Sequence, residues 1–292
     1  MSAKKSRSYE KKFEVAAPAD AVWKAITDGE ELIRWFCVEA KCEPGPGGEQ
    51  EIDWGGGAKA TQKIVIWQPG THLRTEAVKP DRSKPSETDP AEPYAIDWYQ
   101  ETEGGITRVR MVASGFGEGP DWDHEYDGTF HGWDLFHTTL KHYLENHRGK
   151  PANNIVLYAM LSIPAREAWD RLMSPDGLVS AGNMAEIAIG GPFRFVTRDG
   201  DVFEGVVRNY VPGKTFSGLV ESLDKSILIL ELASVPGMGH FLYFSLSTWG
   251  LPKSEVDALK ARLKSIVYGV FPQQTGEPAS ACGVANSEPA SG

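Results

Sequence analysis

The sequence predicts an α+β fold that occurs twice along the 292-residue chain, as two tandem domains. A long helix is expected over residues 130–146, where apolar side chains recur at helical spacing. A second helix over residues 254–271 repeats this apolar stripe at a constant shift of 123 positions (256 minus 133). The paired positions are Trp133 and Val256, Phe136 and Leu259, Leu140 and Leu263, Tyr143 and Ile266, and Leu144 and Val267.

Landmarks earlier in the chain show that the repeat includes more than one helix. Val15, Pro18 and Trp23 match residues 146 positions later, and Gly47 and Gly70 match residues 143 positions later. The sequence therefore predicts a first domain over residues 8–149 and a more divergent second domain over residues 153–272. Residues 273–292 lack periodicity and have few apolar residues, so they are expected to be a disordered tail.

The first domain is expected to begin with a strand over residues 9–16, followed by a short helix that Pro18 opens and that ends near Thr27. Four strand-like segments separated by Gly and Pro turns then form a meander over residues 39–42, 49–54, 60–67 and 72–78. Residues 79–93 are too polar and proline-rich to pack, which predicts a long loop. Strands over residues 94–101 and 106–114 form a hairpin, and an acidic loop leads into the long helix.

The second domain repeats this order of elements. A strand over residues 155–162 precedes a helix over 164–173, and further strands are expected at 186–189, 193–197, 202–207, 215–220, 227–233 and 240–248. Ser254 and Asp257 predict a capping box at the start of the last helix. The strand over 240–248 is apolar on both faces, which predicts that a neighbouring domain or a second copy covers its outer face. A monomer and a homodimer are both compatible with this pattern.

Composition narrows the functional classes. A net charge of −10 argues against a nucleic-acid partner. No apolar run approaches the roughly 18 residues that a membrane span needs, and no signal-type apolar region follows the basic opening residues, so a cytoplasmic protein is expected. Cys37 and Cys42 would lie on opposite faces of a strand, and Cys282 falls in the tail, which predicts reduced thiols.

No metal, cofactor or catalytic motif is predicted. The acidic run from Asp121 to His131 contains possible metal ligands, but a solvated acidic loop before a helix explains it better. His137, His142 and His147 are spaced five residues apart, which differs from the i, i+4 spacing of zinc-binding helices and predicts surface positions.

Several features together resemble the family of homologues of the activator of heat-shock-protein-90 ATPase, within the START-like, helix-grip (SRPBCC) superfamily. These features are the segment FEVAAPADAVWKAIT, the Gly-rich strand–turn pattern and the closing helix GWDLFHTTLKHYLEN. The resemblance is good over residues 9–148 and weaker over 155–271. It implies that an antiparallel sheet curls around the long C-terminal helix, with a cavity between them that holds an apolar small molecule in many relatives.

The resemblance implies that the first domain binds an apolar or amphipathic small molecule. In the predicted hairpin, Val109 and Met111 belong to the uncharged face and should point inward, whereas Arg108 and Arg110 point outward. The expected ligand-binding residues are aromatic or apolar side chains: Trp35, Trp54, Trp98, Val109, Met111, Trp133, Phe136 and Leu140. An equally simple interpretation assigns the aromatic residues to an ordinary core.

Two other functions stay open at this stage. One is a stress-related module that binds a protein partner, as a co-chaperone does. The other is a cyclase-type enzyme, in which polar strand residues inside the cavity act as acid and base. The candidates for that role are His72, Arg74, Asp97 and Tyr99, although an exposed strand face accounts for them without any function.

Overall fold

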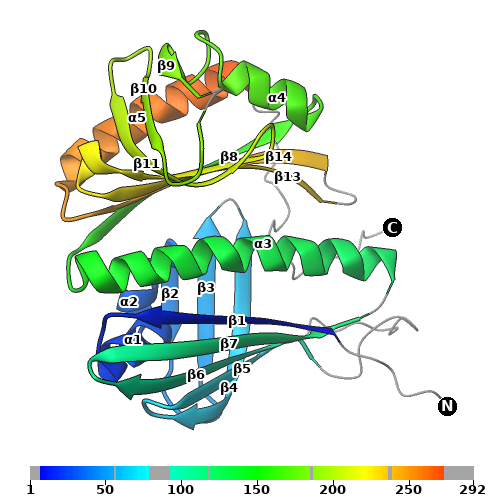
Figure 1. Cartoon of the computed structure of the whole chain (residues 1–292). Coiled ribbons are helices and arrows are strands. Elements are labelled where there is room, and N and C mark those ends of the chain that lie inside the picture. The colour runs from blue at the N-terminus through cyan, green and yellow to red at the C-terminus, as the bar shows by residue number, and fades with distance from the viewer. Residues whose placement is uncertain are drawn as a thin grey trace. The chain divides into compact units, whose positions relative to one another are not determined.

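The computed structural model describes residues 7–55, 57–78, 93–117, 119–184, 187–235 and 239–272. The chain divides into two compact units, with the boundary between Arg148 and Gly149. Each unit contains one seven-stranded antiparallel sheet with a long helix against one face (Figure 1), which confirms two tandem helix-grip domains of the α+β class. Residues 79–92 of the loop predicted at 79–93, and the predicted tail at 273–292, lie outside the described residues.

In the first domain the strands follow the order β1-β7-β6-β5-β4-β3-β2, so the first strand pairs with the last and the others form a meander. Its elements are β1 (Arg7–Val15), α1 (Ala19–Thr27), α2 (Gly29–Leu32), β2 (Glu39–Cys42), β3 (Glu49–Gly55), β4 (Ala58–Gln68), β5 (His72–Ala77), β6 (Ala95–Glu103), β7 (Ile106–Phe116), α3 (Pro120–His142) and a π-helical turn (Tyr143–His147). The sequence missed α2, whose four residues are too few to show a periodic pattern.

Helix α3 begins ten residues earlier than the sequence predicts, at Pro120 rather than Phe130. The prediction of an acidic loop before the helix is therefore wrong, because the acidic residues after Pro120 form the first turns of α3. Proline at the first helical position and acidic residues in the following turns both favour helix formation. Arg7 reinforces this end of the helix through an ion pair with Asp123 at 2.5 Å.

The inward and outward faces of β7 are those predicted. Val109 and Met111 are 2% and 0% exposed, whereas the Arg108 side chain is 58% exposed. On this outer face Arg108 pairs with Glu14, and Arg110 pairs with Glu10 on β1. The alternate residues of β7 that include Arg108 and Arg110 thus face solvent, and the uncharged residues between them face α3.

The second domain has the same strand order, β8-β14-β13-β12-β11-β10-β9. Its elements are β8 (Ala152–Leu161), α4 (Ala165–Leu172), β9 (Ala181–Asn183), β10 (Pro192–Val196), β11 (Val202–Val211), β12 (Thr215–Val220), a 3-10 turn (Glu221–Leu223), β13 (Ser226–Val235), β14 (Gly239–Trp249) and α5 (Lys253–Val270). None of the helices in the described ranges is long and apolar enough to cross a bilayer.

Two local predictions for the second domain are wrong. The strand expected at 186–189 is found instead as β9 at Ala181–Asn183, where Gly182 packs directly against the backbone of β10. The capping box is also absent, because α5 begins after Pro252 with no side-chain cap, and Asp257 pairs with Lys253 at 2.6 Å instead. Proline at the N-cap already fixes an extended backbone, so the helix starts without the serine.

Candidate functional site

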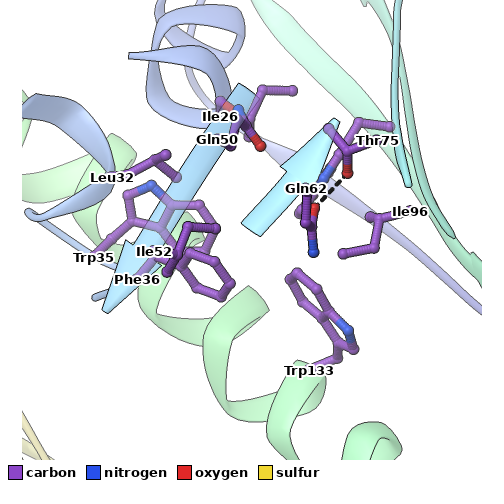
Figure 2. Close-up of a pocket in the computed structure, with 11 residues that line it drawn as sticks. Ile26, Leu32, Trp35, Phe36, Gln50, Ile52, Gln62, Thr75, Ile96 and Trp133 are labelled. Atoms are coloured by element: carbon purple, nitrogen blue, oxygen red, sulfur yellow. Dashed lines mark hydrogen bonds between the residues drawn. The ribbon is translucent and has the colours of Figure 1, made fainter. Parts of the chain in front are cut away.

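A cavity of about 20 Å³ lies in the first domain between the inner face of the sheet and α3. Three of the predicted ligand-binding residues line it, namely Trp35, Trp98 and Trp133. Figure 2 shows Trp35 and Trp133 among the lining residues. The complete lining consists of Ile26, Leu32, Trp35, Phe36, Gln50, Ile52, Gln62, Thr75, Ile96, Trp98 and Trp133. A volume of this size holds about one water molecule.

One wall of the cavity is aromatic. The Phe36 ring stacks on Trp133 with centroids 5.5 Å apart, and Trp98 meets Trp133 edge to face at 5.6 Å. The indole N–H groups of Trp35 and Trp133 bond away from the space, to the Ala25 carbonyl at 2.8 Å and to the Tyr94 hydroxyl at 3.2 Å. Because these donors are satisfied elsewhere, the ring faces and edges present an apolar surface.

The opposite wall is polar and comes from three neighbouring strands. Gln50 on β3, Gln62 on β4 and Thr75 on β5 point inward, and each is buried between neighbours that are more exposed. The Thr75 hydroxyl donates to the Gln62 oxygen at 2.5 Å, and the Gln50 amide donates to the Ile26 carbonyl at 3.0 Å. Figure 2 shows the Gln62 nitrogen directed toward Trp133. These three residues were not predicted from the sequence, although polar side chains on the inward-facing positions of three strands were a detectable signal.

The second domain fills the corresponding space. Matching strand registers align Gln50 with Phe193 and Thr75 with Gly218, 143 positions later. The Phe193 ring lies so close to Gly218 that a Cβ there would be 2.6 Å from Phe193 Cε1. Phe193 is 2% exposed and belongs to the apolar core of this domain. Glycine on β12 therefore makes room for a phenyl ring where the first domain keeps polar side chains and a cavity.

The other predicted ligand-binding residues do not line the cavity. Val109, Met111 and Leu140 are 2%, 0% and 0% exposed, and Trp54 is also buried. Phe136 is half-buried and contacts Phe36 with ring centroids 4.7 Å apart. The alternation of residues along the strands correctly predicted which side chains point inward. It could not distinguish inward side chains that fill the core from those that line a cavity.

Replacing Met111 with tryptophan is expected to destabilise the first domain by about 1–3 kcal/mol, because a fully buried site has no room for an indole ring. Chemical denaturation would measure the change. Val112→Trp on the outer face of the same strand is the control and should cost much less. A Met111→Trp protein as stable as the unmodified one would show that empty space extends to this position.

His137 is buried, contrary to the predicted surface position. It is 3% exposed, and neither ring nitrogen has a hydrogen-bond partner among the described residues. Its ring stacks on Trp133 at 5.5 Å and meets the edge of Trp98 at 5.8 Å, so it lies directly behind the aromatic wall. Burial, and secondarily the charge of Lys11, lower the pKa of His137 to about 3, which keeps the imidazole neutral.

The π-helical turn at the end of α3 also changes the predicted histidine geometry. His147 is 2% exposed, and its Nε2 lies 3.2 Å from Nε2 of His142. A spacing of five residues separates side chains on an α-helix but aligns them on a π-helix. Across the described ranges, no group of three or more His, Cys, Asp or Glu side chains is arranged to hold a metal ion.

The four residues considered as acid and base lie on the outer face of the sheet, outside the cavity. His72 Nε2 and Asp97 Oδ1 are 2.7 Å apart, and Arg74 donates to the other Asp97 oxygen at 2.7 Å. The Tyr99 ring stacks on His72 with centroids 4.1 Å apart. These contacts bury Asp97 within an ion-pair network, so the residues stabilise the strand face and have no access to a molecule in the cavity.

A second hollow lies at the sheet edge, between α2 and strands β2 and β3. It is an open groove of about 470 Å³, lined mainly by acidic side chains: Asp28, Glu30, Glu43, Glu49 and Glu51. Cys42 lines this groove, whereas Cys37, five residues earlier in the chain, is buried. Neither cysteine forms a disulfide bond within the described residues. Burial raises the pKa of Cys37 to about 12 and that of Cys42 to about 11, so both remain protonated and unreactive near neutral pH.

Several solved structures are similar to part or all of this chain at low sequence identity. The Aha1 dimer from Colwellia psychrerythraea is 18% identical, with 48% of this chain and 96% of that chain covered and a TM-score of 0.41. Protein MLL2253 from Mesorhizobium loti is 20% identical, with 47% and 96% covered and a TM-score of 0.39. The di-domain ARO/CYC BexL from the BE-7585A biosynthetic pathway is 16% identical, with 97% and 100% covered and a TM-score of 0.41.

No curated protein sequence matches the chain. A family model does match, over residues 16–145, and its description is Activator of Hsp90 ATPase homolog 1-like protein. The matched segment runs from the end of β1 through α3 and includes every residue that lines the cavity. Over this segment the first domain is therefore similar to Activator of Hsp90 ATPase homolog 1-like proteins.

Proposed function

We propose that the first domain binds an apolar or amphipathic small molecule in the cavity between its sheet and α3. The observation that carries this proposal is the contrast between the two copies of the fold. The second copy closes the space with Phe193 over Gly218, whereas the first copy leaves it open beside Gln50 and Thr75. A core under selection for packing alone favours the filled arrangement, because cavities cost stability.

Binding of a molecule larger than water requires the cavity to widen. The side chains that can move are Phe36 and Phe136, since Phe36 follows the short helix α2 and Phe136 is half-buried. The two rings contact each other with centroids 4.7 Å apart, so a shift of one frees space for the other. Ligand entry is then coupled to side-chain rearrangement, which slows association relative to an open pocket.

The proposal can be tested by introducing residues of the second domain at the matching positions of the cavity wall in the first domain. The double variant Gln50→Phe/Thr75→Gly copies Phe193 and Gly218 into the first domain and should fill the cavity while keeping the fold. The unmodified protein is expected to bind the uncharged fluorescent dye N-phenyl-1-naphthylamine in this cavity. The double variant should bind the dye at least about tenfold more weakly, because the added phenyl ring covers the apolar surface that the dye would contact.

The single variant Thr75→Gly is the matched control, because it removes a side chain without adding a ring and should retain dye uptake. Melting curves establish that each variant is folded. Equal dye binding by the double variant and the unmodified protein would contradict the proposal, as would an unmodified protein that binds no dye. A native mass spectrum of protein purified from its own host would then identify the natural ligand as an adduct; a protein-interaction module would carry none.

A further inference from the structure

The polar wall of the cavity indicates what kind of molecule the first domain accepts. Gln50, Gln62 and Thr75 are 4%, 7% and 2% exposed, so all three polar side chains are buried. Strand register aligns them with Phe193, Gly205 and Gly218, none of which has a polar side chain. Buried amides and hydroxyls cost stability unless they are hydrogen-bonded, so the first domain retains a feature that its own second copy shows to be dispensable for the fold.

The hydrogen bonds of Gln62 leave one group unused. Its amide oxygen accepts from the Thr75 hydroxyl at 2.5 Å, which fixes the orientation of the amide. The amide nitrogen carries two hydrogens and donates to no described residue. Figure 2 shows this nitrogen directed into the cavity, toward the Trp133 ring. A fixed donor facing an internal space is suited to an acceptor on a bound molecule.

The rest of the lining restricts the ligand further. All the lining residues are apolar, aromatic, amide or hydroxyl side chains, and none carries a charge. A charged ligand would lose its hydration without gaining an ionic partner, which is unfavourable by several kcal/mol or more. Phe36, Trp98 and Trp133 contribute three aromatic rings to the lining, and aromatic side chains pack well against flat rings.

We infer that the ligand is an uncharged molecule with a planar ring system and an oxygen that accepts a hydrogen bond from the Gln62 amide nitrogen. Gln62 is then the residue that determines specificity, and Thr75 positions it by holding its oxygen. This inference rests on the proposed function, because it concerns the same cavity. It adds a requirement that a purely apolar site lacks, since the acceptor oxygen is recognised by a single oriented donor.

Two probes that differ mainly in one oxygen test the inference: 2-acetylnaphthalene, which has a carbonyl acceptor, and 2-ethylnaphthalene, which has none. Equilibrium dialysis measures the dissociation constant of each probe for the full-length protein. The double variant Gln62→Leu/Thr75→Val removes both partners of the internal hydrogen bond, so no buried group is left unpaired and the fold should persist. The measured quantity is the ratio of the two dissociation constants, which cancels general hydrophobicity when proteins are compared.

We expect the preference for the ketone, measured by this ratio, to be about three- to tenfold greater in the unmodified protein than in the double variant. A factor of this size corresponds to the free energy that one hydrogen bond contributes. Gln100→Leu is the control, because this buried glutamine lies on the inner face of β6 but bonds to the Ala19 carbonyl and lies outside the cavity lining. It should leave the ratio unchanged.

If both probes bind and the double variant keeps the ratio, the role of Gln62 is overturned and the cavity proposal survives. If neither probe binds the unmodified protein, the proposed function itself fails, and the inference with it.

Discussion

Replacing Phe193 with alanine is expected to lower the unfolding free energy of the second domain by about 3–5 kcal/mol. Phe193 is 2% exposed, meets Phe216 edge to face with centroids 5.1 Å apart, and covers Gly218. The change removes these contacts and leaves a void that the surrounding strands fill only in part. Because the chain has two domains, hydrogen exchange of peptides from β12 and β13 is the suitable measurement, since it reports on this domain alone.

The same substitution should give the second domain the space that the first domain has. An apolar dye is expected to bind to the Phe193→Ala protein with increased stoichiometry, because a void lined by apolar side chains accommodates apolar molecules. Phe193→Leu is the control and should cost less stability and bind less additional dye. If exchange rates in β12 and β13 stay at the unmodified level, the ring is not part of a packed core. The argument from the contrast between the two domains would then be lost.

Acidification is expected to destabilise the first domain through His137. The pKa of this buried imidazole is about 3 in the folded protein and about 6.5 when unfolded, so between these values the unfolded state binds more protons. Stability is therefore complete above about pH 6.5 and falls as the pH is lowered toward 3. At about pH 5 the loss from this residue is roughly 2 kcal/mol. The charged groups nearest to it are Lys11 and Asp134, which pair with each other at 2.6 Å.

The test compares unfolding free energies of the unmodified protein and His137→Phe from about pH 7.5 to pH 5. Phenylalanine is of similar size and suits the contacts with Trp98 and Trp133. Carboxylates titrate in both proteins, so the difference between the two curves isolates the histidine. The curves should diverge below about pH 6.5, with the variant retaining more stability. Parallel curves would mean that His137 is charged or hydrogen-bonded in the folded state.

Much of the fold is predictable because it depends on patterns that repeat along the chain. The inward face of β7 follows directly from alternation between apolar and polar residues. The start of α3 was not predicted, because acidic residues in its first turns obscure the helical spacing of Trp122, Tyr126 and Phe130. Proline and acidic residues mark a loop and a helix start equally well, and only the folded context distinguishes them.

The candidate site is less accessible to sequence reasoning than the fold. Trp35, Trp98 and Trp133 could be identified as inward-facing aromatic residues, but so could Met111 and Leu140, which fill the core. Whether a space remains depends on the fit of side chains from many strands and is a property of no single residue. Gln62 could have been identified from the sequence for the opposite reason. A polar residue on an inward parity conflicts with the local pattern, and such conflicts often mark functional positions.

The π-helical turn at Tyr143–His147 has a consequence for alignments of the two halves of the chain. The shift of 123 positions aligns the apolar stripes of the two helices, and the last pair of the stripe is Leu144 and Val267. Beyond that point the wider turn rotates the first helix out of phase, so an ungapped alignment pairs the buried His147 with Val270, which is half-exposed. The two halves can therefore be aligned without a gap only as far as Leu144 and Val267, and the last residues of the two helices have no common pattern of burial.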